Sequence, residues 1–177
     1  MVVADTYVKS KVEQERQATA FAAEAGIDLR VVVPGNLCVG PIASPGINGT
    51  MQRLKDIVTG TNTLKGAADL AIVHVSDVVA AHDKCMSLDS ASGRYLAAAD
   101  MIKIEDVFEA LKALYPTMPI APMANMDIAS GVQGQSRKIE ARITSELGIE
   151  LKPFQTALKD SVDSMIAKNL IAIPGAA

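Results

Sequence analysis

The run Leu29-Arg30-Val31-Val32-Val33, closed by Pro34, is the segment that most restricts the fold. Its β-branched side chains predict a strand over residues 29–33. No polar residue alternates with the apolar ones after Arg30, which is typical of a parallel strand with both faces covered. Such a strand needs neighbours on both edges, yet only a helix is predicted before it. We therefore expect the sheet to be incomplete within the chain, with strands supplied by a partner or by the rest of a larger enzyme.

Predicted helices and strands alternate along the rest of the chain. Strands are predicted over residues 70–75 and 94–98. Helices are predicted over 5–25, 50–59, 76–88, 104–114 and 139–147, with a last helix around 158–166. This alternation is typical of an α/β fold with a mainly parallel sheet. Residues 117–135 hold most of the irregular sequence.

Composition excludes several classes of partner. With 17 basic and 20 acidic residues, the formal charge is −3, so no positive field attracts nucleic acid or an anionic membrane. Cys38 and Cys85 lie far apart and form no Cys-x-x-Cys pair, which fits a reducing cytoplasm. No apolar run approaches the ~20 residues of a membrane span, and the N-terminus lacks a signal-peptide pattern. We expect a cytoplasmic protein with no nucleic-acid or membrane partner.

Tyr7 and Lys11 are the first candidate pair for chemistry. They are four residues apart on the helix predicted over 5–25, for which Asp5 or Thr6 is the expected cap, so both side chains leave from one face. An ammonium beside a phenol favours the phenolate, and such a tyrosine can act as general acid or base toward a carbonyl or hydroxyl group. Spacing alone leaves a simpler alternative open, in which Tyr7 packs and Lys11 lies in water.

Longer motifs follow this pair in a recognisable order. They are Tyr7-Val8-Lys9-Ser10-Lys11, then residues 31–41 (VVVPGNLCVGP), 72–82 (IVHVSDVVAAH) and 93–96 (GRYL). In this order they resemble the extended short-chain dehydrogenase/reductase family, especially its dihydroflavonol reductase-like and epimerase/dehydratase members. The resemblance covers nearly all 177 residues. It implies that residues 1–100 form the C-terminal part of a Rossmann-like doubly wound parallel sheet, and 101–177 a small, mostly helical substrate-binding region.

The same resemblance implies an NAD(P)-dependent oxidoreductase that reduces a ketone or aldehyde. Tyr7 would donate the proton to the substrate carbonyl, and Lys11 would hold the nicotinamide ribose and tune Tyr7. A loop would lie against the nicotinamide of NADP or NAD, formed by Pro34, Gly35, Asn36 and Leu37.

The substrate pocket would be shaped by the helix after Gly49 and by the 117–135 segment. In that segment Met118, Met123 and Met126 would form either an adaptable apolar lid or simple packing.

Two parts of the family's site are missing from the sequence. No Gly-x-x-Gly-x-x-Gly or Gly-x-Gly-x-x-Gly fingerprint occurs, the turn that brings the pyrophosphate to a helix N-terminus. The family's catalytic serine lies upstream of the tyrosine, and only six residues precede Tyr7. We therefore expect a C-terminal fragment with an incomplete cofactor site, inactive by itself. The sequence does not distinguish NAD from NADP.

Other candidate groups carry less chemistry. His74 and His82 are eight residues apart with no third ligand at a metal spacing, so a structural role and no metal site are expected. Cys38 is expected to be a packed thiol, because no histidine is near it in sequence. Ser76 or Asp77 is expected to cap the helix over 76–88, with Asp77 also organising local hydrogen bonds.

Two alternatives to the reductase remain open. One is part of a sugar-nucleotide epimerase or dehydratase, although residues 117–135 hold no arginine cluster for a diphosphate. The other is a non-catalytic half-fold that serves as a binding or assembly subunit, with its open sheet edge paired to another chain. A homodimer through the first helix and the helix after the Pro34 loop is a further expectation, by analogy with the family.

Overall fold

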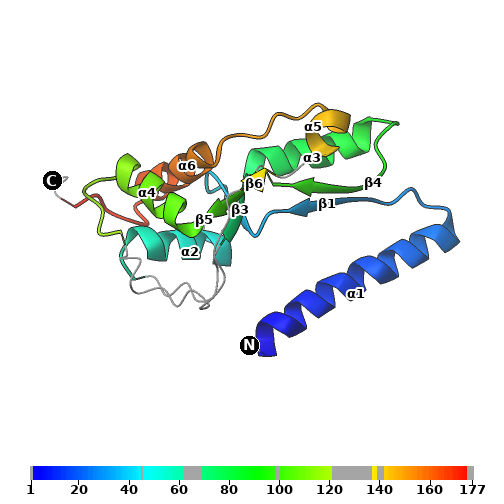
Figure 1. Ribbon diagram of the computed structural model, residues 1–177, viewed down its shortest axis with the longest axis horizontal. Coiled ribbons are helices and arrows are strands. Elements are labelled where there is room, and N and C mark those ends of the chain that lie inside the picture. Colours follow the sequence, from blue (N-terminus) through cyan, green and yellow to red (C-terminus); the bar gives the residue numbers. More distant parts are fainter. Residues whose placement is uncertain are drawn as a thin grey trace.

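A computed structural model of the chain describes residues 2–44, 46–61, 69–98, 100–120, 137–138 and 142–174. Its strands form two sheets (Figure 1). In the first, β1 (Arg30–Pro34) pairs in parallel with β4 (Gly93–Ala97). In the second, β2 (Leu37–Val39) pairs in parallel with β3 (Asp69–His74), and β5 (Asp100–Lys103) lies antiparallel between β3 and β6 (Arg137–Lys138). The expected α/β class with parallel strands is confirmed.

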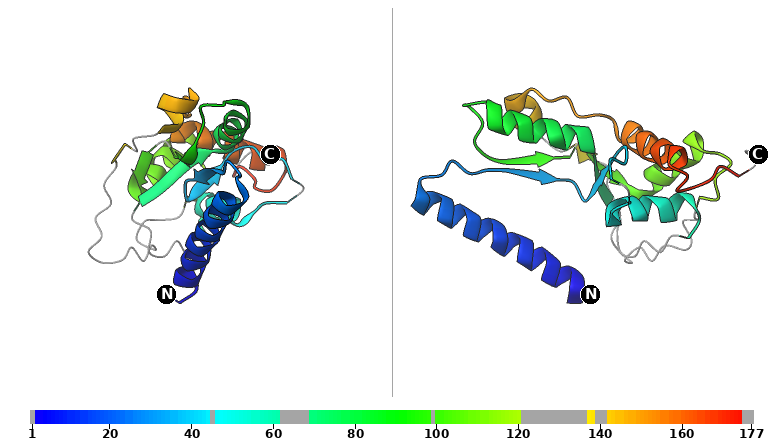
Figure 2. Two further views of the ribbon diagram at one scale, coloured as in Figure 1. Left: turned by 90° about the vertical axis from the view of Figure 1, so that its right-hand side faces the viewer. Right: turned by 180° about the vertical axis from the view of Figure 1, so that it is seen from behind.

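Six helices accompany these strands in the described part of the chain. They are α1 (Val2–Ala25), α2 (Gly49–Val58), α3 (Val75–Ser87), α4 (Ile104–Leu114), α5 (Arg142–Leu147) and α6 (Phe154–Ala167). α3 and α5 pack against the β1–β4 pair on one side, and α1 lies on the other (Figures 1 and 2). The helices and strands predicted from periodicity are all present, with ends shifted by a few residues. α1 begins at Val2, ahead of the predicted caps Asp5 and Thr6.

The structure differs from the sequence-based prediction at three strands and one cap. β2 lies within the segment predicted as a loop, and β5 and β6 were not predicted. The cap of α3 is His74 rather than Ser76 or Asp77, because the imidazole Nδ1 accepts the Ser76 N–H at 3.1 Å. The predicted helix start at 139 lies outside the described residues, and α5 begins at Arg142.

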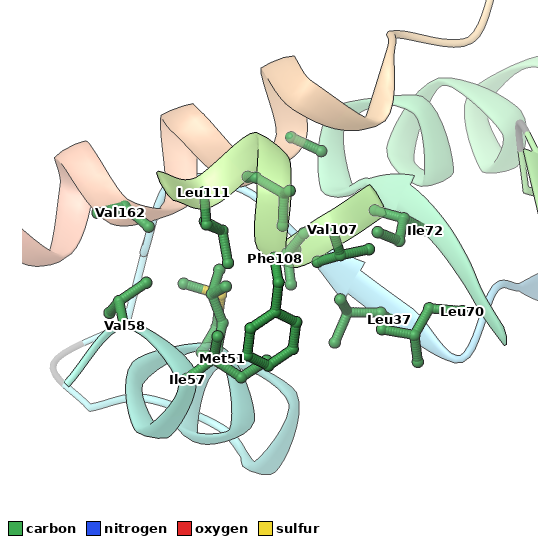
Figure 3. Packing of buried hydrophobic residues seen from close by; sticks show 14 of the residues in the cluster. Leu37, Met51, Ile57, Val58, Leu70, Ile72, Val107, Phe108, Leu111 and Val162 are labelled. Atoms are coloured by element: carbon green, nitrogen blue, oxygen red, sulfur yellow. The ribbon is translucent and has the colours of Figure 1, made fainter. Parts of the chain in front are cut away.

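The larger apolar core joins residues from both sides of position 100. Leu37, Leu70 and Ile72 of the second sheet pack with Phe108 of α4 and Leu158 of α6 (Figure 3). The predicted boundary between a 1–100 and a 101–177 region therefore falls within one packed unit of sheet and helices, and the division stays a prediction.

A second core lies between the β1–β4 pair and helices α3 and α5. Tyr95 of β4 is fully buried there; its hydroxyl donates to Glu146 at 3.1 Å and accepts the Ser92 N–H at 3.0 Å. The Arg142 guanidinium of α5 lies 4.8 Å from the centre of the Tyr95 ring, and this contact together with the Tyr95–Glu146 hydrogen bond attaches α5 to β4. Within α5, Arg142 also forms an ion pair with Glu146.

β1 has a strand partner on one edge only among the residues the structure describes. Its three valines are half-buried, whereas the inner residues of β3 are buried. β1 is thus less covered than its run of three valines requires, in agreement with the expected incomplete sheet.

Candidate functional site

Tyr7 and Lys11 lie one above the other on α1, as their spacing predicts. The Lys11 Nζ is 5.8 Å from the centre of the Tyr7 ring and donates a hydrogen bond to Gln14 Oε1 at 3.2 Å. The Tyr7 side chain is 62% exposed. The phenol and the ammonium are therefore adjacent, accessible from one direction, and not engaged in core packing.

The Pro34–Leu37 segment is held tightly where β1 passes into β2. The Gly35 N–H donates to Ala97 O at 2.9 Å, and Asn36 Oδ1 accepts the Ala71 N–H at 2.9 Å. A Cβ at position 35 would lie 2.2 Å from Ala71 O, so only glycine fits against β3. Leu37 is buried in the larger core. These contacts connect β1 to both sheets and fix the backbone of the segment.

The contacts described above for Tyr7 and Lys11 lie within α1, and the Pro34–Leu37 segment is held by β3 and β4. α1 runs back beneath β1 and diverges from it toward the N-terminus (Figure 1). In its second half, Glu15 forms an ion pair of 2.9 Å with Arg94 of β4, and Ala22 is buried. Four apolar side chains of α1 remain more than half exposed, namely Tyr7, Val8, Val12 and Phe21.

A hollow of about 290 Å³ lies between the end of β2 and the start of α2, and we call it the loop pocket. Its apolar side chains include Cys38, Ile42, Ile47, Met51 and Val75, and none of the described residues that line it is charged. Its size is at the small end of ligand sites. The helix after Gly49, predicted to shape a substrate pocket, supplies Thr50 and Met51 to this wall.

The thiol at this pocket is not set up as a nucleophile. Burial, with the nearby Asp77 carboxylate, raises the pKa of Cys38 above its ordinary value. A raised pKa keeps the neutral thiol at physiological pH. This agrees with the expectation of a packed Cys38.

His74 is a buried structural residue at the junction of β3 and α3. It is 3% exposed. In addition to the cap that it makes for α3, its Nε2 lies 3.3 Å from Asp160 Oδ2 of α6, without forming a hydrogen bond. Asp77 accepts the Lys152 N–H at 2.8 Å and the Ser76 hydroxyl at 3.2 Å, so it organises local hydrogen bonds without capping α3. The sequence offered no signal for the His74–Asp160 contact, because the two residues lie in separate segments of the chain.

Two further predictions concern metal ligands and methionines. His82 Nδ1 lies 2.8 Å from Val78 O within α3, and the described residues contain no group of three potential metal ligands. Met118 is buried in the larger core, which favours simple packing over a lid for this residue. Met123 and Met126 lie outside the described residues.

Curated relatives match almost the whole chain, although no protein-family model matches it. Cinnamoyl-CoA reductase 1 of Petunia hybrida is 30% identical over 168 residues, covering 95% of this chain and 50% of that protein. Tetraketide alpha-pyrone reductase 1 of Arabidopsis thaliana is 27% identical over 167 residues, covering 94% and 49%. The chain therefore spans about half the length of the curated relatives it matches.

Solved structures show the same fold. Vestitone reductase from alfalfa (Medicago sativa) gives a TM-score of 0.72 at 19% identity, covering 89% of this chain and 50% of that one. The yeast methylglyoxal/isovaleraldehyde reductase complexed with NADPH gives 0.69 at 15%, covering 88% and 49%. The Thermus thermophilus UDP-glucose 4-epimerase complex with NAD gives 0.65 at 19%, covering 97% and 54%. In the described part of the chain, no helix is long and apolar enough to cross a membrane.

Proposed function

Because this chain belongs to the extended short-chain dehydrogenase/reductase family, we propose that it is one half of an NADP- or NAD-dependent enzyme that reduces a ketone or aldehyde. The observation that carries the proposal is the 30% identity over 95% of the chain to a cinnamoyl-CoA reductase, together with Tyr7 and Lys11 side by side on an exposed helix face. The matched curated relatives named above are both reductases.

In this enzyme Tyr7 donates a proton to the carbonyl oxygen of the substrate while the cofactor, when bound, supplies the hydride. Lys11 holds the nicotinamide ribose, and its ammonium lowers the cost of negative charge on the Tyr7 oxygen. The geometry supports these roles because the ammonium lies 5.8 Å from the Tyr7 ring and both groups are accessible.

The residues present fit the nicotinamide end of the cofactor. The Pro34–Leu37 segment has a backbone fixed against β3 and β4, which suits a surface that must hold a flat ring in one position. The sequence contains no Gly-x-Gly-x-x-Gly turn for the pyrophosphate. Binding of the whole dinucleotide therefore requires residues beyond those of this chain.

The loop pocket is the proposed place for the substrate carbonyl. Its apolar side chains and lack of charge favour a neutral group, whereas a sugar nucleotide carries a diphosphate that calls for arginine or lysine. This lining supports the reductase over the epimerase or dehydratase alternative.

The free edge of β1 supports two further proposals about partners. A second polypeptide segment, in the same protein or in another chain, pairs with β1 and covers the exposed apolar side chains of α1. If no cofactor half exists, the same edge makes the chain a non-catalytic assembly subunit. We also propose a homodimer through α1 and α2, and a cytoplasmic location.

The first test is the intact mass of the native polypeptide, captured from its source with an antibody to this chain. A mass well above 18.6 kDa with peptides upstream of Met1 supports the enzyme, and a mass near 18.6 kDa supports the assembly subunit. The longer form would then be assayed for oxidation of NADPH and NADH with ketones and aldehydes. Tyr7→Phe should lower kcat by about 10²-fold or more, since it removes the general acid. Tyr115→Phe, at a tyrosine outside the proposed site, is the control, and turnover of Tyr7→Phe within threefold of wild type would refute the assigned role.

A further inference from the structure

One wall of the loop pocket is irregular backbone that receives its support from a distant helix. This wall, here called the rim, consists of Gly40, Pro41 and Ile42. The Ile42 N–H donates to Ser164 Oγ of α6 at 2.9 Å. The sequence separation of 122 residues means that α6 stabilises the rim through tertiary structure alone.

A second polar contact lies one turn away on the same helix. Asp160 and Ser164 are four residues apart, so both project from one side of α6. Asp160 Oδ2 lies 3.3 Å from His74 Nε2, and the imidazole lies next to the space that a side chain at position 40 would need. A Cβ at position 40 would be 3.2 Å from His74 Nε2 and 2.7 Å from Val75 Cγ1. His74 therefore supports the rim at Gly40, and Ser164 supports it at Ile42.

α6, which carries Asp160 and Ser164, is itself firmly anchored. Another side of the helix is buried in the larger core through Ala157, Leu158, Val162 and Met165. The rim belongs to no helix or strand, although Gly40 is buried and Ile42 is partly buried. α6 is therefore a regular, core-packed element against which the irregular rim is held.

We propose that α6 sets the shape of the loop pocket through this pair of contacts, and that His74 and Ser164 are positioning residues for whatever ligand the pocket holds. The assignment of that ligand to a carbonyl substrate rests on the proposed function. The mechanical coupling of α6 to the rim does not, and it can be tested on this chain alone.

The two ring nitrogens of His74 have separate neighbours, which gives the proposal a discriminating variant. Nδ1 accepts the Ser76 N–H at 3.1 Å and lies 2.7 Å from the Ser76 hydroxyl, whereas Nε2 faces Asp160 and Gly40. Asparagine is a strong helix cap and can keep an acceptor near the position of Nδ1. His74→Asn should therefore keep the cap of α3 and remove the ring from Asp160 and Gly40.

The probe is the thiol of Cys38, which lines the pocket and is half-buried. Its rate of alkylation by iodoacetamide, in a Cys85→Ala background, reports how often the pocket opens. Ser164→Ala removes one hydrogen bond to the rim and should raise the rate about fivefold, the factor expected for one ordinary hydrogen bond. Ser164→Thr keeps a hydroxyl and should restore the slow rate.

The matched control is Ser161→Ala, on the same helix. Ser161 is fully buried and its hydroxyl donates to Ala157 O within α6, without reaching the rim. It should change the alkylation rate less than twofold, although it also removes a hydrogen bond from α6. Exchange of the Ile42 amide with deuterium should rise in Ser164→Ala and stay unchanged in Ser161→Ala. His74→Asn should also raise the alkylation rate, with exchange of the Ser76 amide unchanged.

The outcomes separate the two ideas. Equal rates in Ser164→Ala and Ser161→Ala, or a slow rate in His74→Asn, would overturn the coupling of α6 to the rim whether or not the protein is a reductase. A selective effect of Ser164→Ala and His74→Asn would support the coupling even if the longer protein reduced no carbonyl compound.

Discussion

Replacement of Gly35 by alanine should be among the most damaging single changes in the chain. The added Cβ would lie 2.2 Å from the Ala71 carbonyl oxygen and 2.9 Å from its carbon. Both are backbone atoms of β3, so relief of the clash requires one strand to move. The Gly35 N–H to Ala97 O bond and the Ala71 N–H to Asn36 Oδ1 bond, each 2.9 Å long, would be stretched by that movement.

The expected cost follows from these contacts. Inserting an extra methyl group into packed structure typically costs about 1–3 kcal/mol, and weakening two hydrogen bonds adds about 1 kcal/mol each. Reduced freedom of the unfolded chain returns about 0.4–1 kcal/mol. The free energy of unfolding should therefore fall by about 2–5 kcal/mol, a large share of the 5–15 kcal/mol of a typical domain.

Urea unfolding followed by circular dichroism would measure this loss. Gly49→Ala is the matched control, because Gly49 is the first residue of α2 and a Cβ there meets nothing within 4 Å. It should leave the free energy of unfolding unchanged or raise it by up to about 1 kcal/mol. If Gly35→Ala cost no more than Gly49→Ala, the fixed backbone that we infer for the Pro34–Leu37 segment would be wrong.

Two predictions concern pH. Burial, and a hydrogen bond donated to Asp163, raise the pKa of Tyr115, so the folded state keeps the phenol neutral and stability should fall as pH rises above the unfolded value of about 10. Tyr115→Phe should lose about 1 kcal/mol at pH 7 and show a flatter stability profile from pH 8 to 11 in urea titrations; an equally steep fall would contradict the assignment. Hydrogen bonds from Arg142 hold the pKa of Glu146 below its ordinary value, so the stability it contributes is present above about pH 4.5 and lost as pH falls through the lowered value. Glu146→Gln should therefore lose less stability than wild type between pH 5 and 2, and identical acid profiles would argue against the Arg142 pair.

Local patterns in the sequence predicted the elements whose periodicity reflects burial. The apolar spacing of Ile104, Val107, Phe108 and Leu111 predicted α4, and these four side chains are buried in the larger core. The β-branched run of β1 predicted both a strand and its missing neighbour. In each case the apolar pattern within a single segment indicates which side of it faces the core.

Features that depend on distant residues were missed. β2 and β5 are three and four residues long and exist because they pair with β3 on either edge. The capping of α3 by His74 depends on the side-chain rotamer of the imidazole, which propensities by residue type do not describe. The position of Tyr7 relative to the Pro34–Leu37 segment could not be predicted either, because it depends on what packs against α1.

The proposed catalytic pair lies on an exposed face of α1. Tyr7, Val8 and Val12, all in the first half of that helix, are each more than half exposed, whereas Glu15 in the second half forms an ion pair with Arg94 of β4. An exposed ion pair contributes about 0–1 kcal/mol, too little to fix a 24-residue helix against the sheet. Catalysis needs Tyr7 held within a fraction of an ångström of its productive position. The segment that pairs with β1 must therefore also bury Val8 and Val12 if the chain takes part in a reaction. The same segment would then complete both the sheet, by pairing with β1, and the active site, by packing against α1.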